Sequence, residues 1–234
     1  MIEEKKLFEE YVRGFDLNIE ALMHKYTHTF RVIAYATVIA RSLNLSEEEV
    51  NTCRICALFH DIGRFPQYMK YKSYYDYETC DHGDLGEEVL RKLGYKDELV
   101  LKVVKFHNKV YIPNDLTKEE ELFLKITRDA DKIDIMIEQA KVNTDEKYYL
   151  DEDNKQKLLN NKLLEAIDQK NNTLRILKVT ALIFDINFKK SFEILKEKDI
   201  INKKMKLIID KFPNEETFML KDHFNKFLDD KLKN

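Results

Sequence analysis

The adjacent pair His60-Asp61 is the feature of this sequence with the clearest chemical meaning. It ends a predicted apolar helix, where one imidazole and one carboxylate would meet at the same point. Two such groups at a buried helix end are costly unless they are paired or bound to a metal. Three further histidines and one aspartate lie on either side of the pair: His28, His82, His107 and Asp131. Six nitrogen and oxygen ligands are enough to hold one or two divalent metal ions.

Each of these histidines also has an ordinary structural explanation. His60 and His107 end predicted helices, where the helix dipole favours an imidazole. His82 precedes a predicted helix and could be a surface residue at its N-terminal cap, a role that Asp81 or Asp84 could equally fill. His28 lies on an apolar helix face, where a core histidine needs only some partner for its ring nitrogens. For the His60-Asp61 pair we favour the metal interpretation, because an apolar helix ends there in two adjacent ligand types.

The residues alone leave two alternative ligand sets open. His24 lies one helical turn before His28, so both could meet one metal. Cys53, Cys56 and His60 share one helical face, which would also suit zinc. Since no second Cys-x-x-Cys follows, we expect both cysteines to be small buried core residues.

The composition indicates a globular and helical protein. Of 234 residues, 44% are hydrophobic, and only 5 are glycine and 3 proline. The charges are mixed, with a net charge of −3, so nothing marks a nucleic-acid or membrane-surface partner. Three cysteines make a disulfide framework improbable, and residues 1–10 have no signal-peptide core. We therefore expect a reduced, cytoplasmic protein without membrane spans.

Capping signals predict where several helices begin. Ser46 and Glu49 form a capping box that opens a helix over 47–60. Thr117 and Glu120 form a second one, which opens a helix that continues through Asp131 to about Ala140. Further helices are predicted over 84–93 and 97–108, and a tyrosine-rich loop over 67–79, after a stop at Gly63 and Pro66.

The polar stretch 141–157 is the best candidate for a boundary or an exposed loop. Beyond it, helical patterning recurs over 174–184 and 189–232. We therefore predict an all-α fold with a metal-binding helical domain over 1–140. A helical extension over 141–234 is expected to pack on that domain.

The order His … His-Asp … Asp, with Ala-Asp-Lys-Ile at the last position, resembles the HD-domain superfamily of metal-dependent phosphohydrolases. The resemblance covers roughly residues 20–140 and implies an HD-domain helical bundle. The family's first ligand is a histidine followed closely by Arg-Val or a similar pair, which points to His28 rather than His24.

His82 and His107 match two additional histidines in the branch of the superfamily that binds two metals. In that branch Asp61 is expected to bridge the ions. The resemblance assigns one ion to His28, His60 and Asp131, and the other to His82 and His107. The stretch Leu-Phe-His-Asp-Ile-Gly-Arg-Phe is also similar to uncharacterised bacterial HD proteins known only as predicted hydrolases.

The sequence departs from the motifs of two HD-domain subfamilies, and this limits the range of expected substrates. The sequence has no Gly-Tyr-Pro motif and carries Phe106-His107 where cyclic-dinucleotide phosphodiesterases have a double histidine. The Leu-Ala-Asp-Arg-Leu-His-Asn pattern of alarmone hydrolases is also absent. The resemblance therefore supports neither cyclic-di-GMP nor ppGpp as the substrate.

We expect a phosphohydrolase that acts on a small phosphorylated metabolite or a nucleotide with a metal-activated water. Its cofactors would be one or two divalent ions: Mn, Fe, Zn, Co, Ni or Mg. Asp61, Arg64 and Lys132 are the expected catalytic residues, and the two cations together with Lys109 would bind the substrate's phosphate. Tyrosines in the loop could stack on a nucleobase or serve as packing.

Two other functions remain open. Some HD-domain proteins with these six ligands resemble non-haem di-iron oxygenases, and nitrogen and oxygen ligands suit iron as well as manganese. The chain could also be a metal-stabilised sensor or binding module without catalysis. The sequence indicates no oligomeric state.

Overall fold

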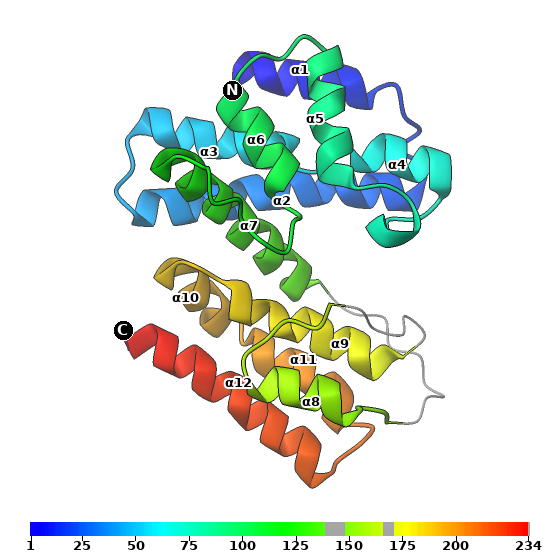
Figure 1. The fold of residues 1–234 in the computed structure, drawn as a ribbon, viewed down its shortest axis with the longest axis vertical. Helices are drawn as coiled ribbons and strands as arrows, with labels where there is room; N and C mark the ends of the chain where they lie inside the picture. The colour runs from blue at the N-terminus through cyan, green and yellow to red at the C-terminus, as the bar shows by residue number, and fades with distance from the viewer. Residues whose placement is uncertain (139–147, 166–170, 234) are drawn as a thin grey trace. The chain divides into compact units, whose positions relative to one another are not determined.

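The computed structural model describes residues 1–138, 148–165 and 171–233, and within them the secondary structure is helical, without a strand (Figure 1). The predicted all-α fold is thus confirmed. Backbone contacts divide the chain into two compact units, Met1–Asp131 and Lys132–Asn234. The boundary expected after Ala140 lies outside the described residues and stays a prediction.

The first unit is built from helices that pack around an apolar core. They are α1 (Ile2–Val12), α2 (Glu20–Ser42), α3 (Glu47–Phe59), α4 (Arg64–Tyr71), η1 (Asp76–Glu78), α5 (His82–Lys92), α6 (Glu98–Phe106) and α7 (Lys118–Ile137), the last of which continues into the second unit. Helix α2 packs along α3, α5 packs along α6, and α3 contacts both α6 and α1. Phe8 of α1 meets Phe65 of α4 edge-on, with ring centroids 6.1 Å apart.

The capping signals predicted the helix starts correctly. At α3 the Ser46 side chain accepts from the Glu49 backbone, and the Glu49 carboxylate accepts from the Ser46 backbone. Thr117 and Glu120 make the same two bonds at the start of α7. Gly94 follows α5 with a φ of 80°, the left-handed conformation that favours glycine.

The tyrosine-rich loop predicted over 67–79 is wrong in its first part. Helix α3 ends before Gly63 as expected, but a new helix, α4, begins at Arg64 and extends to Tyr71 with Pro66 inside its first turn. A proline is tolerated there because the first backbone N–H groups of a helix have no partner within it. Helix α5 also begins earlier than expected, at His82, because the Asp81 side chain caps it through the backbone of Asp84.

Gly63 lets the turn between α3 and α4 approach the start of α5. A Cβ atom at this position would lie 2.2 Å from the His82 carbonyl oxygen and 2.7 Å from the Gly86 nitrogen. Both neighbours are backbone atoms, so neither can move without shifting a helix. This close approach brings the His60-Asp61 turn next to His82.

Gly63→Ala is therefore expected to destabilise the fold by about 1–3 kcal/mol or more, because the backbones must separate. Chemical denaturation followed by circular dichroism measures this loss. Gly14→Ala is a suitable control, since its nearest contact would be the Tyr11 carbonyl oxygen at 3.2 Å. Equal stabilities of the two variants would contradict the tight approach at Gly63.

The second unit has its own apolar core. Besides the end of α7, its elements are α8 (Glu152–Leu159), α9 (Asn172–Ala181), η2 (Leu182–Asp185), α10 (Lys189–Glu197), α11 (Ile200–Ile209) and α12 (Glu215–Lys233). Helix α12 packs against α8, α10 and α11, and α11 also contacts α9 (Figure 1). Phe224 stacks on Phe184 in this core, with ring centroids 5.3 Å apart. In the described part of the chain, no helix combines the length and apolarity needed to cross a bilayer.

Candidate metal centre

Six side chains expected to bind metal come together in the first unit. They come from five different helices or helix ends, and they form two groups whose ligand atoms lie within 4.8 Å of one another. The groups are His28, His60 and Asp131, and Asp61, His82 and His107. Four of the side chains lie at helix ends, where the chain can turn a side chain toward a neighbouring helix.

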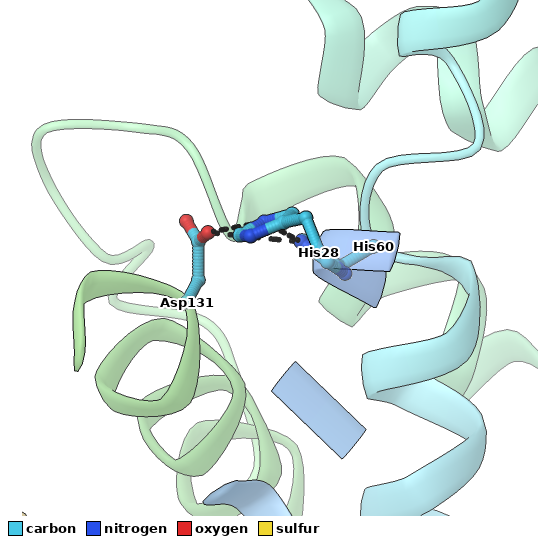
Figure 2. Close-up of side chains that lie close together, drawn as sticks. All are labelled: His28, His60 and Asp131. Carbon is cyan, nitrogen blue, oxygen red and sulfur yellow. Dashed lines mark hydrogen bonds and ion pairs between the residues drawn. The ribbon is translucent and has the colours of Figure 1, made fainter. Parts of the chain in front are cut away.

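The first group joins the middle of α2, the end of α3 and α7 (Figure 2). His28 Nε2 lies 3.0 Å from Asp131 Oδ1 and 3.3 Å from His60 Nε2. Both imidazoles are fully buried, whereas the Asp131 side chain keeps 19% of its surface exposed. Asp131 is therefore the member of this group that is partly accessible to solvent.

The second group joins the first residue of α5 to the end of α6. His82 Nε2 lies 3.0 Å from His107 Nε2, and both rings are buried. Asp61 Oδ1 lies 3.3 Å from the first nitrogen and 3.7 Å from the second.

Asp61 lies between the two groups, and each of its oxygens faces one of them. Oδ2 is 3.5 Å from Nε2 of both His28 and His60, while Oδ1 faces His82 and His107. A carboxylate with this arrangement can contribute one oxygen to each of two neighbouring cations. The geometry fits the bridging role that the sequence resemblance implies for this residue.

The hydrogen bonds of the histidine rings show that a cation fits the centre. His60 Nδ1 lies 2.7 Å from the Ala57 carbonyl oxygen, and His107 Nδ1 lies 2.7 Å from that of Val104. A carbonyl only accepts, so both Nδ1 atoms carry the proton and, in the neutral ring, Nε2 presents a lone pair. The Nε2 lone pairs of these two rings then face the Asp61 carboxylate, and such a set of acceptors is one that a divalent ion stabilises.

The protonation of the ligands agrees with this environment. Burial alone would raise the pKa of Asp61, but Lys25 and His60 hold it well below the usual range. The pKa of Asp131 is lowered in the same way, by His28 and His60 against the effect of burial. Burial lowers the pKa of His107 to about 4, so this ring is neutral at neutral pH. Anionic carboxylates and neutral imidazoles are the forms that bind metals.

The cations predicted to bind substrate have other partners in the structure. Arg64 Nη1 donates to the Tyr74 carbonyl at 2.7 Å and to Asp76 at 2.8 Å, while its Nε lies 3.5 Å from Asp61 Oδ1. Lys132 pairs with Asp185 at 2.7 Å. Arg64 thus contacts both Asp76 and Asp61.

Lys109 pairs with two carboxylates at the start of α5. Its Nζ pairs with Asp81 at 2.6 Å and with Asp84 at 3.1 Å. These two ion pairs engage its ammonium group at the start of α5.

Two residues at the centre had no sequence signal that singled them out. Lys25 lies on α2 one turn before His28, and its Nζ is 2.8 Å from Asp61 Oδ2. Asp76 of η1 accepts from His82 Nδ1 at 2.6 Å. The helical spacing from Lys25 to His28 could have suggested the first contact, whereas nothing in the sequence pointed to the second.

The alternative ligands are also placed. The His24 ring is parallel to that of His28 at a centroid distance of 6.4 Å, and His24 belongs to neither group. Cys53 and Cys56 are fully buried, as expected of core residues. Burial raises the pKa of the Cys53 thiol to about 12, so it is not the thiolate that zinc prefers.

Comparison with known protein families gives one finding. Residues 26–136 match the family model described as HD domain, a range that contains all six side chains of the two groups. Neither the curated proteins nor the solved structures contain a match to the chain.

Proposed function

We propose that this chain is a phosphohydrolase of the HD-domain superfamily that works with two metal ions, a proposal supported by the match of residues 26–136 to the HD-domain family model. The observation that carries the proposal is the position of Asp61, whose two oxygens face two separate groups of ligands. Structural metal sites are usually closed and hold a single ion, whereas paired ions with an open side are typical of hydrolytic centres.

Divalent ions bound there would supply an activated water and hold the substrate's phosphoryl oxygens. The chain's own residues supply orientation. The bonds from Nδ1 of His60 and His107 to carbonyls of their own helices aim both Nε2 atoms at the centre. Asp61 keeps its negative charge beside Lys25, so both of its oxygens stay available as ligands.

Cations beside the centre would stabilise negative charge that develops on the phosphoryl group. Both Lys25 and Arg64 approach the Asp61 carboxylate. Lys25 Nζ lies 2.8 Å from Oδ2, and Arg64 Nε lies 3.5 Å from Oδ1. We propose these two as the main phosphate contacts. Lys132 and Lys109 remain candidates that would first have to leave Asp185 and Asp81.

The substrate class is a small phosphorylated metabolite or, in the narrower proposal, a nucleotide. Tyr75 and Tyr77 flank Asp76 and have exposed rings with centroids 5.9 Å apart. Exposed aromatic rings close to a phosphate site can stack on a nucleobase. Tyr68 and Tyr74 instead pack on each other, with centroids 5.0 Å apart, as expected for loop packing.

The first test is the metal content of protein purified anaerobically without added metal, together with hydrolysis of a panel of nucleotides and phosphorylated metabolites. About two equivalents of a divalent ion per chain and hydrolysis of at least one compound are expected. Iron with oxygen uptake and no hydrolysis would favour an oxygenase instead. Protein that binds no metal even after reconstitution would overturn the enzymatic proposal.

A further inference from the structure

Asp76 has hydrogen-bond donors on both of its carboxylate oxygens. Oδ2 accepts from His82 Nδ1 at 2.6 Å and from Asn108 Nδ2 at 3.1 Å. Oδ1 accepts from Arg64 Nη1 at 2.8 Å and from Gln67 Nε2 at 2.9 Å. An ionised carboxylate is the side chain that can accept from donors on both sides.

His82 needs such a partner because of its place in the chain. His60 and His107 close their helices, so each finds a carbonyl one turn earlier in its own helix. His82 is the first residue of α5, and no helical turn of α5 precedes it. Its Nδ1 must therefore be held from outside the helix, and Asp76 is the residue that holds it.

The bond decides where the other ring nitrogen lies. With Nδ1 held by Asp76, Nε2 of His82 lies 3.3 Å from Asp61 Oδ1 and 3.0 Å from His107 Nε2. A ring without this bond can rotate about its side-chain torsions and move Nε2 away. A carboxylate that orients a metal-binding histidine typically changes metal affinity 10–100-fold.

Asp76 itself is held by an element outside the second group. Gln67, a fully buried residue of α4, donates to Asp76 and also to the Thr79 hydroxyl and the Cys80 carbonyl. These bonds fasten the segment that carries Asp76 onto α4. The first group differs in that His28 and Asp131 lie inside long helices.

We propose that Asp76 is a positioning residue that orients His82 and thereby makes the second metal position, formed by Asp61, His82 and His107, bind an ion tightly. The first position, formed by His28, His60 and Asp131, does not depend on it. The inference rests on the proposed two-metal centre.

Asp76→Asn tests the proposal with little change in shape. Whichever way the new amide faces, His82 Nδ1 meets either its NH₂ group, which cannot accept, or a neutral amide oxygen, which accepts more weakly than a carboxylate oxygen. Titration with Mn²⁺, with the free ion measured by electron paramagnetic resonance, should show two binding steps in the wild type. The variant should keep the first step and weaken the second about 10–100-fold.

A double-mutant cycle with His82→Ala separates positioning from general loosening. In the His82→Ala background the second step is already impaired, and Asp76→Asn should weaken it no further. An additional loss in that background would mean that Asp76 acts on something other than His82, which overturns the inference.

Asp81→Asn is the matched control. Asp81 lies in the same segment and also accepts from Asn108, but it caps α5 through the Asp84 backbone and makes no bond to the His82 ring. Both Mn²⁺ steps should survive this change. The inference fails if Asp76→Asn binds two ions as tightly as the wild type, or if Asp81→Asn loses the second step equally. Wild-type protein that takes up fewer than two Mn²⁺ ions would instead refute the two-metal centre itself.

Discussion

Asp61→Ala is expected to lower kcat/KM at least about 10³-fold and to remove both metal ions, because the two ligand groups share this one carboxylate. An ion that stabilises transition-state charge contributes several kcal/mol, and each 1.4 kcal/mol corresponds to a factor of ten in rate. His60→Ala should abolish hydrolysis as well, but it removes a ligand from the first group only. The helical fold should persist in both variants.

Metal content by plasma mass spectrometry, circular dichroism and steady-state kinetics together check this result. Asp61→Ala removes the carboxylate that pairs with the Lys25 ammonium. The near-isosteric variant Asp61→Asn should therefore be measured beside it. Asp84→Ala is the control, a carboxylate on the surface of α5 that pairs with Lys109. Full phosphohydrolase activity in an Asp61 variant would show that this assignment is wrong.

Lys25→Met is the second change with a large expected effect. In the metal-free chain the Lys25 ammonium neutralises Asp61 at 2.8 Å and lies 5.5 Å from the centroid of the Tyr74 ring. Ions on Asp61 would take over that neutralisation, and the ammonium could then donate to the substrate's phosphoryl oxygens. Loss of one such donor typically costs a factor of about 10²–10³ in rate.

The variant should lose that factor in kcat while it keeps both metal ions, and Lys25→Arg should recover part of the rate. Lys92→Met serves as the control, since Lys92 lies on the exposed face of α5 and pairs with Glu88. If metal content falls together with the rate, Lys25 acts by holding Asp61 and does not contact the substrate.

Helix starts were predicted correctly from the sequence where a capping box marks them. Ser46 and Thr117 marked helix starts because their side chains bond to backbone groups three residues away, an interaction that depends on sequence neighbours alone. The failure at α4 has the opposite cause. Its eight residues include Pro66 and two tyrosines, and the helix is held by tertiary contacts such as Phe65 against Phe8.

The six candidate ligands were identified through the order His … His-Asp … Asp and its resemblance to the HD-domain superfamily, and the structure brings them together in two groups. His60 and Asp61 are neighbours in the sequence, so they lie close together whatever the tertiary structure. The contacts of Arg64 were not predictable, since its main partner Asp76 belongs to a segment whose position no local pattern specifies. Lys132 likewise follows Asp131 directly, yet it pairs with Asp185.

The sequence by itself indicated the helical class and the helix starts marked by the two capping boxes, because these depend on residue type and on neighbours within a helical turn. Its resemblance to the HD-domain superfamily identified the six candidate metal ligands. The tertiary structure alone decided that Asp61 has one oxygen toward each group, that Lys25 neutralises it and that Asp76 orients His82. These are contacts between helices, and their distances depend on packing such as the approach of Gly63 to α5. No pattern within a single helix contains that information.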